Sequence, residues 1–79
     1  MEVSLKGIIA PADWDSDFNV TAIKISTEEE KEFLVERDFM GKKLFNHIRE
    51  LVGVEGVINV DKKGHKIITV REFEVLDQF

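Results

Sequence analysis

The stretch from Leu51 to Leu76 constrains the fold more than any other part of the chain, because it has the pattern of two strands joined by a turn. Alternate positions from Val52 to Val60 are apolar or glycine, which is the period of a half-buried strand. The segment Asp61–Gly64 has turn chemistry, since Gly64 can adopt a positive φ that other residues resist. The return segment Ile67–Leu76 is rich in β-branched and aromatic residues. The stretch therefore predicts a β-hairpin.

Three more strands are predicted upstream, over residues 3–10, 19–26 and 31–37. Gly7 interrupts the first of them, which predicts a bend in the sheet or the close passage of another backbone. Pro11 has no N–H to donate, so we expect it to end the pairing of the first strand. A polar loop then runs from Pro11 to Asn19, because aspartate and asparagine favour turns.

The segment Phe39–Leu51 changes to a helical period, with one apolar stripe of residues. Asp38 is a candidate cap, since its carboxylate can accept hydrogen bonds from free amides at the start of a helix. Gly41 weakens the first turn, so the firm helix is predicted only from about Lys42. Gly53 lies just beyond the expected end. The stripe consists of Leu44, Ile48 and Leu51.

The length of 79 residues and a 43% hydrophobic composition predict one globular domain over residues 1–79. A chain of this size buries only about 60% of its unfolded surface, and the absence of cysteine rules out a disulfide brace. Closing the sheet into a barrel is a plausible substitute brace, because it removes exposed strand edges. The predicted core consists of Phe33, Leu44, Ile48, Val54 and Ile58.

The element order of three strands, one helix and two strands resembles the oligonucleotide/oligosaccharide-binding fold, the OB-fold. The segments around Trp14-Asp15 and 54–57 are similar to small bacterial OB-fold-like proteins of unassigned function. The resemblance implies a mainly β protein: a five-stranded antiparallel OB-like barrel with one short helix between strands 3 and 4. An SH3-like barrel is the competing topology, although it normally lacks a helix of this length.

The resemblance also implies where a ligand would bind: across the second and third strands, between loops 11–18 and 61–65. Trp14 is either a contact anchor or a plug that folds back over the barrel mouth. The lysines of the second loop either hold a phosphate or an acidic partner, or serve only solubility. The candidate ligand- or partner-binding residues are Trp14, Phe18, Lys62, Lys63, His65 and Lys66.

Charge divides the chain into two unequal halves. Residues 1–40 hold ten acidic and four basic residues, net −6, and residues 41–79 hold six acidic and seven basic residues, net +1, which gives the overall −5. Nucleic-acid binding depends largely on cations that contact phosphate, so the acidic balance disfavours it. An acidic surface near the second and third strands instead favours a basic protein partner. Oligonucleotide binding through the hairpin lysines, Lys42, Lys43 and Arg71 is the alternative.

Three alternating aspartates, Asp13, Asp15 and Asp17, look like the start of a calcium-binding loop. The sixth and twelfth positions of such a loop should be Gly and Glu but are Phe18 and Lys24, so a turn with solvated carboxylates is the preferred interpretation, and weak divalent-ion binding stays open. His47 and His65 have no obvious third ligand. We therefore predict neither a metal nor a cofactor.

Catalysis is not expected, because the chain has no cysteine nucleophile, Gly-rich phosphate loop or zinc spacing. No apolar run reaches the roughly 18 residues of a membrane span, and the first residues do not have the pattern of a signal peptide, so a cytoplasmic protein is expected. The sequence thus predicts a non-catalytic binding module. Protein interaction is the preferred function, single-stranded nucleic-acid binding is the alternative, and the oligomeric state is left open.

Overall fold

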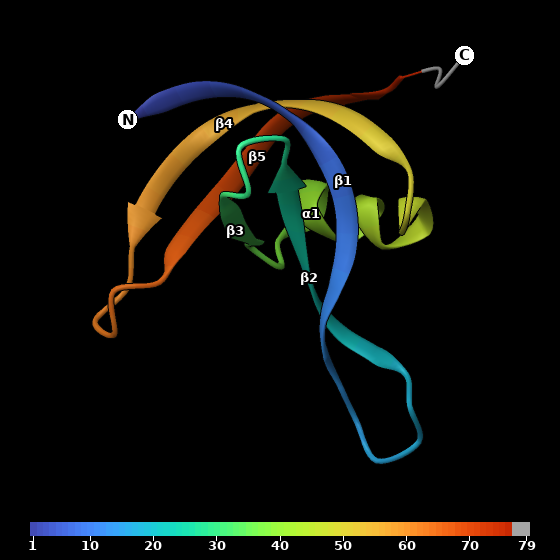
Figure 1. Cartoon of the computed structure of the whole chain (residues 1–79). Coiled ribbons are helices and arrows are strands. Elements are labelled where there is room, and N and C mark those ends of the chain that lie inside the picture. The colour runs from blue at the N-terminus through green and yellow to red at the C-terminus, as the bar shows by residue number, and fades with distance from the viewer. Residues whose placement is uncertain (77–79) are drawn as a thin grey trace.

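The computed structural model describes residues 1–76, which form a closed barrel of five strands with one short helical segment (Figure 1). In chain order the elements are β1 (Glu2–Trp14), β2 (Val20–Thr27), β3 (Glu32–Val35), α1 (Phe39–Lys43), the 3₁₀ segment η1 (Leu44–His47), β4 (Leu51–Val60) and β5 (Lys66–Val75). The strands are ordered β1-β2-β3-β5-β4, and β4 pairs with β1 to close the ring. The predicted fold class is therefore confirmed, including the helix between the third and fourth strands.

One part of that prediction is wrong, because the barrel is not wholly antiparallel. β3 runs parallel to β5, through the pairs Leu34–Ile67 and Val35–Ile68, and the other four pairs of neighbouring strands are antiparallel. The reason is geometric: directions cannot alternate all the way round a closed ring with an odd number of strands. A five-stranded barrel must contain at least one parallel pair.

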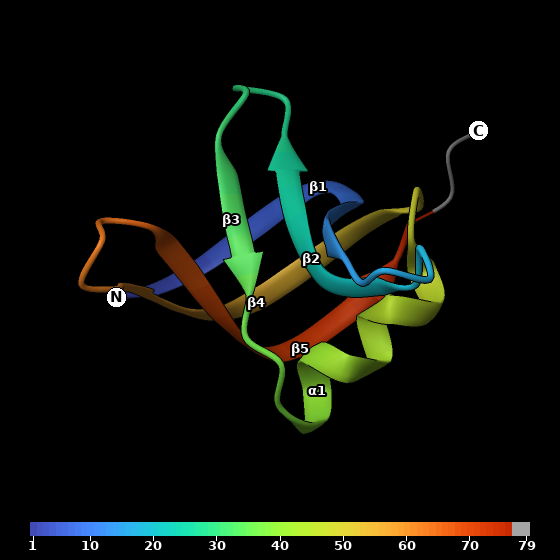
Figure 2. The same cartoon turned by 90° about the horizontal axis from the view of Figure 1, so that it is seen from below.

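The helical segment begins where the sequence predicts but is built differently. Asp38 caps it, since its Oδ1 accepts a hydrogen bond of 2.9 Å from the N–H of Gly41. The α-helical turn is Phe39–Lys43, the part expected to be weak, and residues 44–47 form a 3₁₀ turn in place of the predicted firm helix. Gly41 is buried there, and a Cβ at this position would overlap the carbonyl oxygen of Glu36. Close packing therefore explains this glycine, and Figure 2 shows α1 beside β5.

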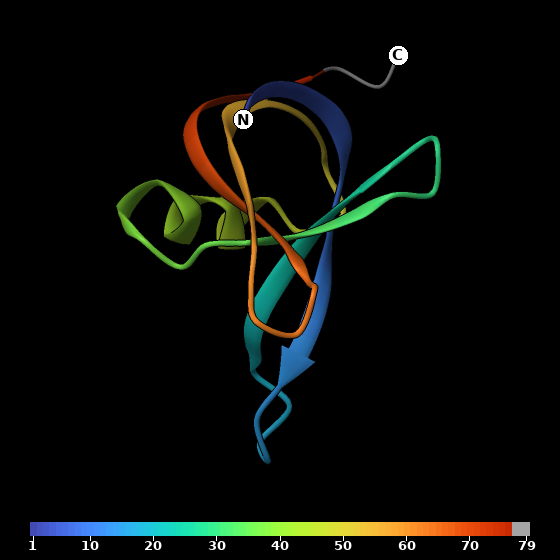
Figure 3. The same cartoon turned by 90° about the vertical axis from the view of Figure 1, so that its left-hand side faces the viewer.

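β1 continues through Pro11, contrary to the prediction that pairing ends there. Pro11 pairs with Ile23, and irregular register follows as far as Trp14. Pairing with β4 covers only residues 2–8 of β1, so Pro11 lies on a part of the strand that has β2 as its one paired neighbour. Proline is tolerated on such edges and at bulges because no ladder bond needs its missing N–H. The resulting β1–β2 hairpin projects beyond the barrel (Figure 3).

The barrel interior is filled by side chains from all five strands and η1. Phe33, Leu44 and Val54 are buried as predicted, whereas Ile48 and Ile58 pack partly buried against the core. Gly7 faces the backbone of β2, where a Cβ would overlap the carbonyl oxygen of Ser26, so the expected close passage of another backbone is confirmed. The buried set also includes Ile9, Ile23, Ile25, Val52, Ile68 and Val70.

Candidate partner-binding site

The site is built on a hairpin turn that occurs three times in this chain, over residues 15–19, 27–31 and 61–65. In each, the first residue donates its N–H to the carbonyl of the fifth at 2.9 Å, and the fourth donates to the carbonyl of the first at 3.0–3.1 Å. A side-chain oxygen of the first residue accepts from the N–H of the fifth at 2.8–3.3 Å. The fourth residue has a positive φ every time: 65° at Phe18, 62° at Glu30 and 87° at Gly64. These are hairpin loops with a left-handed residue at the fourth position.

Phe18 is unfavourable in that left-handed position for two reasons, its backbone conformation and its exposure. The left-handed conformation is unfavourable by about 1–2 kcal/mol for a residue with a Cβ, and glycine avoids this cost, as at Gly64. The residue is also 85% exposed, so its aromatic side chain gains little burial in return. Glu30 has the same backbone conformation, but its side chain is polar and suited to water. Phe18 is therefore the residue of the hairpin that the fold explains least.

Trp14 lies at the end of β1 on the same projecting hairpin. The residue is 52% exposed and does not belong to the core cluster, and its backbone pairs with Val20. Trp14 therefore does not plug the barrel, and its role as a contact anchor stays a prediction. Trp14 and Phe18 together give the hairpin two exposed aromatic side chains.

Aspartate carboxylates fix the shape of two of these turns. The Oδ1 of Asp15 accepts from the N–H groups of Asp17 and Asn19, and its Oδ2 accepts from the side-chain amide of Asn19. These bonds, above all the one from the Asn19 N–H, hold the pKa of Asp15 below its ordinary value of 3.8. The pKa of Asp61 is lowered in the same way, chiefly by the N–H of His65. The Asp15 carboxylate is engaged within its own turn, and residues 1–76 contain no group of acidic or histidine side chains that could hold a metal ion.

A shallow groove lies across β2 and β3, between the β1–β2 hairpin and the β4–β5 turn. It encloses about 300 Å³ and is lined by Ala12, Lys24, Glu32, Leu34, His65 and Lys66. Lys24 and Glu32 form a salt bridge of 3.0 Å on its wall. The Nζ of Lys66 lies 5.8 Å from the centroid of the Phe33 ring. The groove occupies the surface on which the OB-fold resemblance places a ligand.

The six predicted residues are only partly brought together. His65 and Lys66 line the groove, whereas Lys62 and Lys63 are exposed in the β4–β5 turn and do not line it. Trp14 and Phe18 lie on the β1–β2 hairpin and do not line the groove either. Sequence reasoning missed the contribution of Lys24, although strand alternation, which places Lys24 on the face opposite Ile23 and Ile25, was a usable signal.

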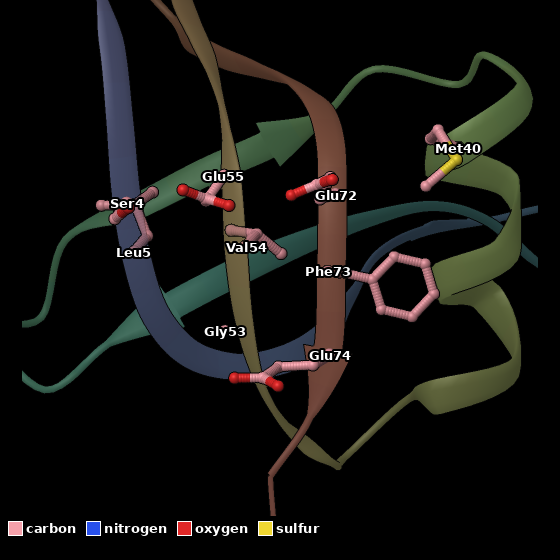
Figure 4. A pocket seen from close by; sticks show the side chains of 9 residues that line it. All are labelled: Ser4, Leu5, Met40, Gly53, Val54, Glu55, Glu72, Phe73 and Glu74. Atoms are coloured by element: carbon pink, nitrogen blue, oxygen red, sulfur yellow. The ribbon is translucent and has the colours of Figure 1, made fainter.

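A second and larger hollow, of about 590 Å³, was not predicted at all (Figure 4). Its acidic residues come together through strand register: Glu55 pairs with Glu72, and Gly53 pairs with Glu74. An irregularity in the β4–β5 ladder sets that register, so sequence alone could not place these side chains opposite one another. The hollow is lined by Ser4, Leu5, Met40, Gly53, Val54, Glu55, Glu72, Phe73 and Glu74.

No protein-family model, curated protein or solved structure matches the chain significantly. None of the helical segments within residues 1–76 has the length and apolarity needed to cross a bilayer.

Proposed function

We propose that this chain is a non-catalytic binding module that docks onto a protein partner through the tip of the β1–β2 hairpin. The observation that carries this proposal is Phe18, an 85% exposed aromatic residue in a backbone conformation that glycine would adopt more easily. Strained backbone that the fold does not need is typical of functional contacts. The order of the elements supports placing the module among small OB-fold-like proteins.

The charge around the aromatic tip indicates the kind of partner. Asp13, Asp15 and Asp17 are exposed beside Trp14 and Phe18, and the hairpin carries no basic residue between positions 13 and 19. A partner surface with an apolar pocket surrounded by lysine or arginine would complement both features. Aromatic side chains that enter such pockets commonly dominate binding energy.

A capture experiment with matched variants tests this function. Three proteins are immobilised and exposed to an extract of the source organism: the wild type, the Phe18→Gly variant and the Glu30→Gly variant. Both substitutions place glycine at the same position of the same turn, so both should preserve the fold. We expect a protein that the wild type and Glu30→Gly retain and that Phe18→Gly loses. Equal retention by all three proteins would contradict docking through Phe18.

Oligonucleotide binding is a second candidate, supported by the basic side chains of Lys24, His65 and Lys66 around the groove. The net charge of −5 opposes it, and Phe33, the aromatic residue beneath Lys66, is buried and offers no face for stacking. Titration of short single-stranded DNA and RNA at about 50 mM salt separates the two functions. Micromolar affinity that falls steeply with salt and is lost in Lys66→Ala would favour the nucleic acid.

A further inference from the structure

The outer face of α1 carries a second phenylalanine that the barrel leaves in water. Phe39 is 77% exposed, and Phe18 on the hairpin is 85% exposed. The other phenylalanines of residues 1–76, which are Phe33, Phe45 and Phe73, are buried or half-buried. The helix does not need an aromatic residue at this position, because the Asp38 side chain supplies its cap. The fold therefore explains neither of the two exposed rings.

Lysine side chains surround the exposed ring of α1. Lys42 and Lys43 follow Phe39 by three and four positions, so the three residues share one face of the helix. The Nζ of Lys43 lies 4.6 Å from the centroid of the Phe39 ring. Both lysines are exposed, and neither forms an ion pair within residues 1–76. We refer to Phe39, Lys42 and Lys43 as the helix patch.

The helix patch and the hairpin tip, residues 13–18, have opposite charge and the same kind of apolar group. The tip carries Asp13, Asp15 and Asp17 beside Phe18. Complementary charge promotes the encounter of two protein surfaces, and two aromatic rings pack favourably edge to face. One contact between the two surfaces would cover both exposed rings and bring the carboxylates next to the lysines. The chain thus carries a counterpart for its own hairpin tip.

A single chain does not make this contact with itself. Figure 3 shows the β1–β2 hairpin extending away from the barrel, while α1 lies against the side of the barrel. The turn at the tip is held in its shape by the hydrogen bonds of the Asp15 carboxylate to the N–H groups of Asp17 and Asn19. The counterpart of the tip is therefore found on another copy of the chain.

We propose that the hairpin tip of one copy docks onto the helix patch of a second copy. This inference rests on the proposed docking through Phe18 and identifies the partner as the chain itself. Two different surfaces meet, so the contact is head-to-tail, and each copy in a dimer leaves one tip or one patch free for further growth. The contact involves one turn and one helical face, so it is weak, and its charges make it sensitive to salt.

Analytical ultracentrifugation of the purified chain and two variants tests the proposal. At about 50 mM salt the average mass of the wild type should rise between about 10 µM and about 1 mM protein, and it should return to that of one chain at about 500 mM salt. Phe18→Gly removes the tip and Phe39→Glu removes the patch, so each should associate at least tenfold more weakly. Glutamate is favoured in the first turn of a helix, so Phe39→Glu should still fold.

An equimolar mixture of the two variants distinguishes a head-to-tail contact from any other. Phe18→Gly keeps an intact patch and Phe39→Glu keeps an intact tip, so the mixture should form a dimer that neither variant forms alone and that grows no further. Val60→Glu is the matched control, because it makes the same kind of change at another apolar residue, which is 63% exposed on β4. This control should associate as the wild type does.

The proposal is overturned if the wild type stays monomeric, if either single variant associates as strongly as the wild type, or if the mixture forms no dimer. A monomeric wild type that captures another protein through Phe18 would overturn self-association and leave the proposed function in place. A monomeric wild type that binds phosphatidylserine vesicles and loses that binding in Phe39→Glu would also overturn it, because the helix patch would then recognise a membrane surface.

Discussion

Three turns of the same type carry three different residues in the left-handed fourth position. The effect of the side chain in that conformation can therefore be compared within one chain. Phe18, Glu30 and Gly64 share the hydrogen-bond pattern around them and differ in the side chain that the backbone carries. A Cβ at Gly64 would have no heavy atom within 4 Å, so only the backbone conformation decides the effect of a substitution there. Substitutions at the fourth position of these turns therefore measure conformational strain separately from packing.

We expect Phe18→Gly and Glu30→Gly each to raise the free energy of unfolding by about 1 kcal/mol, because glycine adopts the left-handed conformation without the Cβ clash. Gly64→Ala should lower it by about the same amount for the converse reason. Urea unfolding followed by circular dichroism measures all three. A lower stability of Phe18→Gly would mean that the ring makes a stabilising contact and that strain is not its main effect.

The aspartates that close two of the turns should make the hairpins sensitive to acid. The folded pKa of Asp15 and of Asp61 lies below the ordinary 3.8, so each carboxylate stabilises its turn fully above pH 3.8. That stabilisation is lost as the pH falls through the lower folded value, where the carboxylate is protonated and accepts hydrogen bonds less well. NMR titration of the Asn19 and His65 amides should show midpoints below 3.8. Asp15→Asn keeps an acceptor oxygen and should abolish the Asn19 transition; a midpoint above 3.8 would contradict the direction of the shift.

At the scale of the elements, α1 depends on the close approach of Gly41 to the carbonyl oxygen of Glu36. Alanine is the better helix former by up to about 1 kcal/mol, yet we expect Gly41→Ala to destabilise the chain by about 1–3 kcal/mol net of that gain. The methyl group would overlap the carbonyl oxygen of Glu36 and force α1 away from the connection that follows β3. Thermal unfolding measures the effect, and Lys42→Ala, at an exposed position of the same turn, should change stability by less than about 0.5 kcal/mol. A stability gain in Gly41→Ala would show that propensity outweighs packing here.

The sequence predicts those elements best whose signal is local. The strand at residues 51–60, the turn glycine Gly64 and the Asp38 cap each depend on neighbours within a few positions, and each is confirmed, although burial alternates only from Val52 to Gly56 and Val60 is exposed. The prediction that pairing ends at Pro11 is wrong because the tolerance of a proline depends on which side of β1 lacks a paired neighbour, a property of the whole barrel. The helical segment is also predicted imperfectly, but for a local reason: Gly41 packs against the carbonyl oxygen of Glu36, five residues earlier, and side-chain periodicity does not report such a backbone contact.

The candidate sites also differ in whether their sequence signal is local. Trp14 and Phe18 could be singled out from sequence because large aromatic residues in a polar hairpin are unusual wherever the hairpin lies. The acidic hollow could not, because its residues come from β1, β4, β5 and α1 and meet only through strand register. Glu72 and Glu74 share a face by their spacing, but their position relative to Glu55 depends on the irregular register of the β4–β5 ladder.

For the molecule as a whole, closure with five strands requires a parallel pair, and this β3–β5 pair is the weakest strand contact of the barrel. The parallel β3–β5 contact consists of two residue pairs and one further hydrogen bond, from the Glu36 N–H to the Ile68 carbonyl at 2.9 Å. The β4–β5 ladder, by contrast, runs through nine pairs. β3 itself has four residues, so it contributes little pairing on either side. Opening the barrel at β3 breaks fewer bonds than opening it anywhere along β4.

We therefore expect native-state hydrogen exchange to show two levels of protection. Amides of β3, residues 32–35, should exchange through local opening, on the order of a hundredfold faster than the hydrogen-bonded amides of β4 between residues 52 and 58. The slow β4 amides should report global unfolding, so a destabilising core substitution away from β3, such as Ile9→Val on β1, should accelerate them by the full loss of stability and leave β3 exchange nearly unchanged. Equal protection of β3 and β4 would mean that the barrel opens only as one cooperative unit, and that the parallel seam is as strong as the antiparallel ladders around it.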